Sequence, residues 1–285
     1  MRSAQPTRAA RIPEVLLRLD QVTITNTMTA TDVVCGVSFS LTTGGVAGIV
    51  GESGSGKTLT CRAVLGILPE RFTVSAGSIG LFGADTSDFD APAWTKLRGG
   101  DISAVFQDPG SYLNPSIRVG KQVEEVIRVK TGVARSAARN RAIKLFDLVR
   151  LHEPEYVFQQ YPHELSGGML QRVAIAAAIA LEPRVLIADE ATTALDVTVQ
   201  AEILDLLVEL QERIGLSLLV VSHDLAVVAR LCDEVLVMKS GEVVEQGSTA
   251  DILFDPQHSY TRLLIDEHHQ FGLERFLDKG VPDHV

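Results

Sequence analysis

The sequence has 285 residues, of which 46% are hydrophobic and 22% charged, and its formal net charge is −10. This length suits one or two domains of about 150 residues, and the ordinary composition excludes a small disulfide-stapled fold and a disordered chain. Because 36 acidic residues outweigh 26 basic ones, a surface built mainly to hold nucleic acid is disfavoured.

Signals for disulfides and for the membrane are absent from the sequence pattern. Cys35, Cys61 and Cys232 lack the paired spacing of zinc sites or disulfide frameworks, which indicates a reducing compartment. The apolar run 173–181 is far shorter than the about 20 residues of a membrane-spanning helix. No apolar segment follows residues 1–12, so we expect a flexible N-terminal tail and no signal peptide.

The strand signals describe an α/β protein. Alternation of polar and apolar residues predicts strands at 15–25 and 33–41. Unbroken apolar runs at 46–50, 185–188 and 218–221 predict strands that are buried on both faces. Each of these runs is followed by polar residues and then by a helical segment, which is typical of a parallel sheet.

Helical periodicity predicts most of the remaining elements. Residues 197–214 carry an apolar stripe that should cover the sheet, formed by Val199, Ile203, Leu206, Leu210 and Ile214. Between about 108 and 180 the strand signals vanish, so we expect an all-helical insertion. After residue 248 the chain has the pattern of short helices, with Pro256 and Gly272 as breakers.

Residues 51–58 match the phosphate-binding pattern G-x-x-x-x-G-K-[ST], between a buried-type strand and a helix. Glycines let successive N–H groups turn toward phosphate oxygens at a helix start, Lys57 would reach the β- and γ-phosphates, and Thr58 would bind Mg²⁺. The alternative, a flexible Gly/Ser turn, is disfavoured by the flanking elements. The expected nucleotide-binding residues of this loop are Gly51, Glu52, Ser53, Gly54, Ser55, Gly56, Lys57 and Thr58.

Two further segments carry polar chemistry. Asp189 and Glu190 follow the run 185–188, where open α/β sheets bind ligands. Asp189 suits Mg²⁺ coordination and Glu190 suits a base for the attacking water, whereas an ordinary charged loop start is the alternative. Residues 165–172 begin a helix that Ser166 can cap, which is either a plain capped helix or a second anion-binding end that another chain would complete.

In this order the motifs resemble those of the ATP-binding subunits of ABC transporters. They are the loop 51–58, Gln107 in Phe-Gln-Asp, the Leu-Ser-Gly-Gly signature at 165–168, the pair Asp189–Glu190, Asp196 in Ala-Leu-Asp and His223 in Ser-His-Asp. The resemblance covers about residues 15–250. It implies an α/β fold of the P-loop NTPase class, with a RecA-like mixed sheet core, an N-terminal antiparallel β-subdomain and the all-helical insertion.

The resemblance also implies a domain organisation and an assembly. The ATP-binding domain would span residues 13–250, with the helical subdomain at about 108–180 and a C-terminal helical tail at 251–285. Two such domains would hold two ATP molecules head to tail. Ser166, Gly167 and Gly168 of one chain would then contact the γ-phosphate bound by the other chain.

The remaining roles follow from the same resemblance. Gln107 would sense Mg²⁺ and the attacking water, and would link the site to the helical insertion, while Asp196 would lie at the dimer seam. His223 would hold the water and Glu190 in register, although a lone histidine at a strand end is more often satisfied by backbone groups. Catalysis of ATP hydrolysis would thus rest on Glu190, His223 and Gln107, and Mg²⁺ binding on Thr58, Gln107 and Asp189.

Finer features resemble the oligopeptide, dipeptide and nickel importers, and the nickel-importer ATPases most closely. They include residues 58–61 and 65–69, Met-Leu-Gln-Arg at 169–172, and the stretch 258–264. The implied subunit lies at the cytoplasmic face of the cell membrane, bound to two transmembrane permease subunits. A paralogous ATPase or a second copy of this chain would complete the pair, and an extracytoplasmic solute-binding protein would act indirectly.

Three departures from the family pattern stand out. The first aromatic residue is Phe39, so adenine is expected to rest on aliphatic side chains such as Val33 or Met28. Ala191 stands where the family usually has proline. No cysteine follows Cys232, so an iron–sulfur segment is not expected.

Two other functions compete with transport. A soluble ABC ATPase acting on nucleic acid would call for a coiled coil, zinc cysteines or a tandem domain, and the acidic balance disfavours it. An ATPase accessory to a soluble complex, such as the carbon–phosphorus lyase assembly, is barely separable by sequence. The tail histidines His268, His269 and His284 suggest nickel, but adjacent histidines on a helix point about 100° apart, so a solvated face is expected.

Overall fold

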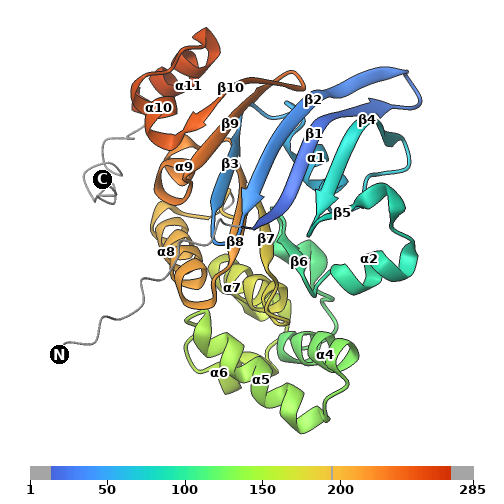
Figure 1. The fold of residues 1–285 in the computed structure, drawn as a ribbon. Helices are drawn as coiled ribbons and strands as arrows, with labels where there is room; N and C mark the ends of the chain where they lie inside the picture. The colour runs from blue at the N-terminus through green and yellow to red at the C-terminus, as the bar shows by residue number, and fades with distance from the viewer. Residues whose placement is uncertain (1–13, 194, 271–285) are drawn as a thin grey trace, which may run out of the picture.

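The computed structural model describes residues 14–193 and 195–270, which form two sheets and a group of helices (Figure 1). The expected tail at 1–12, Gly272 and His284 lie outside the described residues, as do the side chains of His268 and His269. Among the residues that are described, no helix is long and apolar enough to pass through a bilayer.

The first sheet has four antiparallel strands. Their order is β2 (Thr31–Thr42), β1 (Val15–Asn26), β4 (Phe72–Leu81) and β5 (Ala84–Asp85). The strands expected at 15–25 and 33–41 are confirmed as β1 and β2. β4 was not predicted, because most of its residues are exposed and its polar and glycine residues interrupt the apolar alternation.

The second sheet has six strands. Their order is β10 (Glu242–Ser248), β9 (Glu234–Lys239), β3 (Val46–Val50), β8 (Ser217–Ser222), β7 (Val185–Asp189) and β6 (Ile102–Val105). All neighbours are parallel except β9 and β10, which form a hairpin. The three expected buried strands are confirmed, since every residue of β3, β7 and β8 is buried.

Each face of the six-stranded sheet packs in a different hydrophobic core. Ala47 and Ile49 of β3 face the helix α1 (Lys57–Val64) and the four-stranded sheet. Val46 and Val50 of the same strand face the cluster that contains α8 (Val197–Ile214) and α9 (Leu225–Leu231). The sheet is therefore covered on both sides, which explains its continuous apolar strands.

The segment expected to be helical contains helices only, and all of it is described. They are α3 (Pro109–Tyr112), α4 (Val119–Thr131), α5 (Arg135–Leu148), α6 (Pro154–Gln159), the short helix η2 (Pro162–Glu164) and α7 (Gly167–Ala178). This helical subdomain lies below the sheets in Figure 1. α4 and α6 approach closely because Gly120 has no side chain, and a Cβ there would stand 2.2 Å from the Phe158 ring.

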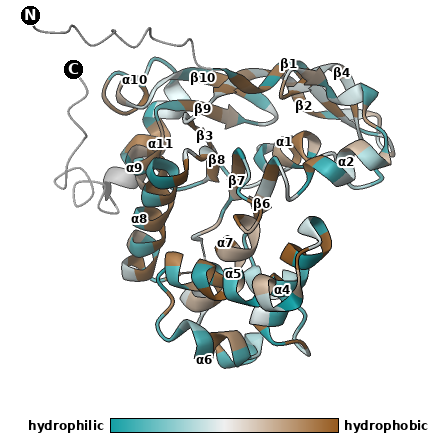
Figure 2. Ribbon diagram, turned by 60° about the horizontal axis from the view of Figure 1, so that its bottom comes forward, coloured by the Kyte–Doolittle hydropathy of each residue, from teal (hydrophilic) through white to brown (hydrophobic). Residues whose placement is uncertain are grey.

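The helix α8 has the bounds that the sequence predicts, and its two faces differ in hydropathy (Figure 2). Ile203, Leu206 and Leu210 of the expected stripe are fully buried. Ile214 is 40% exposed, so the stripe ends before the last turn, next to the left-handed Gly215. Leu204 and Leu207 are buried as well, which makes the apolar face wider than expected.

The C-terminal segment packs on the same core. α10 (Thr249–Phe254) and α11 (Ser259–Gln270) are separated around Pro256, as expected. Tyr260, Leu264 and Ile265 of α11 are buried in the cluster that also contains α9. On the other side of the molecule, η1 (Thr86–Asp88) and α2 (Ala91–Leu97) follow β5.

Candidate functional site

Polar motifs far apart in the sequence meet at one edge of the six-stranded sheet (Figure 1). Gly51 follows β3, His223 follows β8, Gln107 follows β6 closely, and Asp189 ends β7. These four strands are parallel neighbours, so their carboxyl ends lie side by side. The edge therefore collects the residues that the sequence marks as catalytic, in the place where open α/β sheets bind ligands.

The glycine-rich loop at 51–58 is shaped by two glycines. Gly56 precedes α1 with φ +104°, and a Cβ there would stand 2.9 Å from Val34 Cγ2. At Gly51 a Cβ would stand 2.0 Å from the Met238 carbonyl oxygen. The Ser55 hydroxyl is buried and has no hydrogen-bond partner within the described chain, as fits a cradle whose missing partner is a phosphate oxygen.

Lys57 is 4% exposed and folds back on its own loop. Its Nζ donates to the Gly51 carbonyl at 2.7 Å and to the Glu52 carbonyl at 2.8 Å. Burial lowers the pKa of Lys57, and the nearby carboxylates of Glu190 and Asp189 act in the opposite direction. Two backbone carbonyls of the loop thus hold the Lys57 ammonium group near the carboxylates of Glu190 and Asp189.

Thr58 and Asp189 meet across the site. The Thr58 hydroxyl donates to Asp189 Oδ1 at 3.2 Å. Burial raises the pKa of Asp189, while the hydrogen bond from Thr58 lowers it. A hydroxyl and a carboxylate at this distance are the hard oxygen donors that Mg²⁺ takes in small number, with waters filling its remaining positions. The donor set therefore fits Mg²⁺.

Glu190 and His223 form the second pair of the site. Glu190 Oε1 lies 3.7 Å from His223 Nδ1, and the Thr193 hydroxyl lies 3.4 Å from the other carboxylate oxygen. Glu190 has φ +49°, and its N–H donates to the Val221 carbonyl at 2.9 Å. The Glu190 side chain is 17% exposed and that of His223 is 48% exposed. This pair borders solvent, where a water molecule can reach both groups.

Gln107 lies between β6 and α3 and is exposed. The neighbouring Phe106 ring lies 5.4 Å from the Tyr112 ring of α3, measured between centroids. Gln107 therefore stands where the sheet edge passes into the helical subdomain.

The signature segment opens α7. The Ser166 hydroxyl accepts the N–H of Met169 at 3.3 Å, which confirms Ser166 as the cap. A Cβ on Gly168 would stand 2.6 Å from Val199 Cγ1, so the starts of α7 and α8 pack together. Asp196 caps α8 and accepts two backbone N–H bonds at 3.1 and 3.0 Å. Ser166 and Asp196 are both exposed, so two helix starts lie together at the surface.

Sequence reasoning missed two contacts behind the loop. The Gly241 N–H donates to the Ser55 carbonyl at 3.0 Å, and the Glu52 N–H donates to the Tyr260 hydroxyl at 3.0 Å. The signal for Gly241 is the Ser-Gly pair between two apolar runs, which is typical of a hairpin. For Tyr260 no pattern points to the loop, because the contact joins segments far apart in the sequence.

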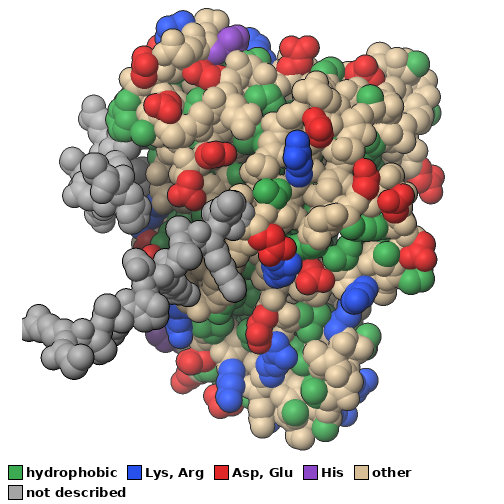
Figure 3. All heavy atoms as spheres, viewed as in Figure 1, with side chains coloured by type: hydrophobic (Ala, Val, Ile, Leu, Met, Phe, Trp, Pro, Cys, Tyr) green, Lys and Arg blue, Asp and Glu red, His purple; other side chains and the backbone are tan. Residues whose placement is uncertain are grey.

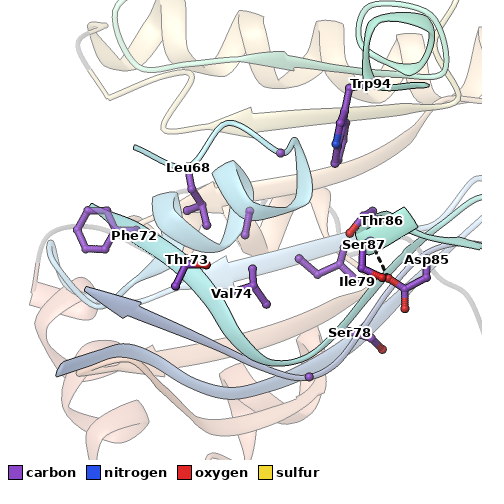
Figure 4. A pocket seen from close by; sticks show the side chains of 13 residues that line it. Leu68, Phe72, Thr73, Val74, Ser78, Ile79, Asp85, Thr86, Ser87 and Trp94 are labelled. Carbon is purple, nitrogen blue, oxygen red and sulfur yellow. Dashed lines mark hydrogen bonds between the residues drawn. The ribbon is translucent and has the colours of Figure 1, made fainter. Parts of the chain in front are cut away.

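A cavity of about 440 Å³ lies away from this edge, between α1, β4 and α2 (Figure 4). Leu68, Phe72, Val74 and Trp94 contribute its apolar lining. The Asp85 carboxylate on its rim accepts the N–H of Ser87, and this bond lowers the pKa of Asp85. The polar group of the rim thus caps η1.

Comparison with known proteins agrees with the motifs that meet at this sheet edge. Residues 34–193 match the family model described as ABC transporter. The chain is 44% identical over 229 residues to the "Dipeptide transport ATP-binding protein DppD" of Haemophilus influenzae, covering 80% of this chain and 69% of that protein. It is 39% identical over 250 residues to the "Metal-staphylopine import system ATP-binding protein CntD" of Staphylococcus aureus, covering 88% of this chain and 92% of that protein.

Among solved structures, the chain is similar to the dimeric ATP-binding cassette MJ0796 in a post-hydrolysis state bound to ADP and Pi. The TM-score is 0.73 at 29% sequence identity, and the match covers 82% of this chain and 99% of that one. The chain spans about two thirds of the length of the dipeptide-transport relative.

Proposed function

This chain belongs to the ABC transporter family, and on that premise we propose that its ATP hydrolysis powers an importer of dipeptides or oligopeptides, or of nickel or a metal chelate. The observation that carries the proposal is the meeting of the loop 51–58, Asp189, Glu190 and His223 at one sheet edge. The relatives named for dipeptide transport and for metal-staphylopine import support the cargo class.

The triphosphate would be bound by the loop and the start of α1. Lys57 turns from the carbonyls of Gly51 and Glu52 to the β- and γ-phosphates, where it neutralises charge. Thr58 and Asp189 would hold Mg²⁺, with Gln107 as a further oxygen donor from the helical side. When bound, Mg²⁺ neutralises charge on the phosphate oxygens during phosphoryl transfer.

Hydrolysis would proceed by in-line attack of water on the γ-phosphorus, which breaks the bond to the oxygen that bridges the β- and γ-phosphates and releases ADP and phosphate. Glu190 accepts the proton of that water, because its carboxylate is the half-buried base at the solvent border of the site. His223 stands 3.7 Å from this carboxylate and would keep Glu190 and the γ-phosphate in register. The hydrogen bond from Thr193 helps to orient the same carboxylate.

The site would be completed by a second ATPase chain, a paralogue or another copy of this one. Ser166, Gly167 and Gly168 open α7 with free N–H groups at the surface, which suit a γ-phosphate bound by the partner. Asp196 opens α8 beside them and would lie at the seam. The dimeric ADP- and Pi-bound cassette to which this chain is similar supports such a pair.

The permease subunits would dock on the helical subdomain beside Gln107. Tyr112 of α3 is 60% exposed and Val129 of α4 is 70% exposed, so this subdomain offers apolar contact area at its surface. A cytoplasmic helix of each permease subunit would bind there, and a solute-binding protein would act through the permease. The chain would thus be a peripheral subunit at the cytoplasmic face of the membrane.

The face drawn in Figure 3 bears acidic side chains scattered across it, with basic ones among them. This distribution agrees with the net charge of −10 and gives no support to a nucleic-acid substrate. The alternative partner is a soluble enzyme complex such as a carbon–phosphorus lyase, whose ATPases resemble this branch.

Purification of the tagged chain from its own cells separates these functions. We expect two polytopic membrane proteins and a second ATPase chain to co-purify in mild detergent. The reconstituted complex should hydrolyse ATP faster when its binding protein carries a peptide or a nickel chelate. Recovery with soluble phosphonate enzymes instead would overturn the transport proposal.

A further inference from the structure

The rear of the phosphate-binding loop rests on the C-terminal third of the chain. β9 pairs in parallel with β3, with Val237 opposite Val50, so the end of β9 lies beside the start of the loop. The close approach of Met238 to Gly51 reflects this pairing. Two consecutive left-handed residues, Ser240 and Gly241, then turn the chain back into β10.

The turn also holds the loop directly. The Gly241 N–H donates to the Ser55 carbonyl, and the Gly241 carbonyl accepts the N–H of Cys35 at 2.8 Å. A side chain on Gly241 would stand 2.7 Å from the Val33 carbonyl oxygen. One hairpin residue thus ties the phosphate-binding loop to β2.

Tyr260 reaches the loop from the first turn of α11. It is 2% exposed, and its hydroxyl oxygen accepts the Glu52 N–H at 3.0 Å. Lys239, at the end of β9, places its Nζ 4.5 Å from the centre of the Tyr260 ring. Burial raises the pKa of Tyr260, so the phenol remains neutral at physiological pH.

The segment that carries Tyr260 is itself anchored. The Glu245 carboxylate of β10 accepts the N–H groups of Gln257 at 2.7 Å and of His258 at 3.1 Å, just before α11. Leu264 and Ile265 bury the next turn of α11 in the core. Tyr260 is thus held from both sides along the chain, as a residue must be if it is to fix another.

Glu52 therefore has partners on both sides of its backbone. Its carbonyl and that of Gly51 accept from Lys57, while its N–H donates to Tyr260. When Lys57 turns to the phosphates, the two carbonyls lose their ammonium partner. The bond from Glu52 to Tyr260 and the bond from Gly241 to Ser55 remain, together with the 3.2 Å bond within the loop from the Ser55 N–H to the Glu52 carbonyl.

We propose that Tyr260 is a positioning residue for nucleotide binding, because its hydroxyl fixes the Glu52 backbone and so preorganises the phosphate-binding loop. This inference rests on the proposed function of residues 51–58. It gives the C-terminal helix α11 a direct part in ATP affinity. Tyr260 touches neither the phosphates nor the reacting water in this scheme, so it acts through Glu52.

The test compares Tyr260→Phe with Tyr156→Phe in the full chain and in the assembled complex. Phenylalanine keeps the buried ring and removes only the hydroxyl, whereas Tyr156 is 63% exposed on α6 and serves as the matched control. The net free energy that one hydrogen bond contributes corresponds to about a three- to tenfold change in an equilibrium constant. We expect Tyr260→Phe to raise the Kd and the KM for ATP by about that factor.

The control readouts separate positioning from simple stability. A residue with only a structural role would lower the Tm and leave the KM at 25 °C unchanged. For Tyr260→Phe we expect the kcat to stay within about twofold while the KM rises, since Glu190 and His223 are untouched. Tyr156→Phe should change neither constant. An unchanged KM for Tyr260→Phe, or tighter ATP binding, overturns the proposal.

Hydrogen exchange of the unaltered chain gives a second test that needs no variant. The Glu52 amide should be protected in the nucleotide-free protein and remain protected with bound ATP. Free exchange of this amide in either state overturns the role of Tyr260. Failure of the unaltered chain to bind ATP would instead overturn the proposed function itself, so the two failures are distinguishable.

Discussion

The sheet edge at 51–58 and the start of α7 are both proposed to face phosphate, but they differ in how much of the site one chain supplies. At the sheet edge, Lys57 donates to carbonyls of its own loop and the Thr58 hydroxyl donates to Asp189, and both Lys57 and Asp189 are buried. At the start of α7, Ser166 is exposed and its hydroxyl accepts a hydrogen bond from the N–H of Met169. From this contrast we expect one chain to bind nucleotide by itself, whereas hydrolysis is proposed to need the exposed helix start of another.

The strongest test of this contrast is Glu190→Gln at the complete edge. Glutamine keeps the size of the side chain but cannot accept the proton of the attacking water, so we expect turnover to fall by about 1000-fold. ATP binding should persist, because Lys57 and Thr58 are unchanged. Steady-state hydrolysis and equilibrium ATP binding measure the two effects. Glu212→Gln, on the exposed side of α8, is the matched control. If Glu190→Gln hydrolysed ATP as fast as the unaltered chain, Glu190 would not be the group that accepts the proton of the attacking water.

Gly167→Asp tests the other side of the contrast. A Cβ on Gly167 would stand 3.6 Å from Leu195, an ordinary contact, so the fold should tolerate the side chain. Its carboxylate would meet the γ-phosphate of the partner chain, and we expect hydrolysis by the assembled pair to fall about 100-fold. ATP binding to the isolated chain should not change.

The control for Gly167→Asp is Ser136→Asp, which adds the same charge to the exposed first turn of α5. We expect it to leave hydrolysis unchanged. If Gly167→Asp instead weakened ATP binding by the isolated chain, the start of α7 would act within its own chain, and the proposed division between the two regions would be wrong.

Asp189→Asn separates binding chemistry from stability at the sheet edge. Burial raises the pKa of Asp189 above its value in the unfolded chain, so the nucleotide-free fold loses stability as the pH rises from the lower value and carries the full penalty above the raised one. Removing the charge should stabilise the nucleotide-free chain at neutral pH, with a smaller gain at acidic pH where Asp189 is protonated. Thermal unfolding across pH measures this gain. Mg²⁺-dependent ATP affinity should fall at the same time. A lower Tm at neutral pH would contradict the prediction.

The strands β1, β2, β3, β7 and β8 and the phosphate-binding loop could be predicted because their signals are local. β3, β7 and β8 are continuous apolar runs, and residues 51–58 have fixed spacing between two such elements. Parallel pairing then brings Asp189 and His223 to the same edge without further information.

The contacts behind the loop could not be predicted in this way. The hydrogen bond from Glu52 to Tyr260 joins two segments through the packing of α11 on the core, and neither segment carries a periodic signal for it. The left-handed backbone of Glu190 depends likewise on tertiary hydrogen bonding to β8, since glutamate has no intrinsic preference for it.

The smallest predicted effect concerns the adenine end, where the structure supplies the least. Met28 is 81% exposed in the turn between β1 and β2, and Val33 lies beside the loop, with its carbonyl oxygen 3.2 Å from a Cβ placed on Gly56. Tyr260 contacts the loop, but it is buried and hydrogen-bonded beneath it, so its ring is not free to stack on a base. Stacking on an aromatic ring contributes about 1–3 kcal/mol per base in other proteins, and aliphatic contact with Val33 would distinguish purines poorly. We therefore expect ATP and GTP to bind within about threefold of each other in competition. A strong preference for ATP would contradict this prediction and would show that the base is read by groups other than Val33.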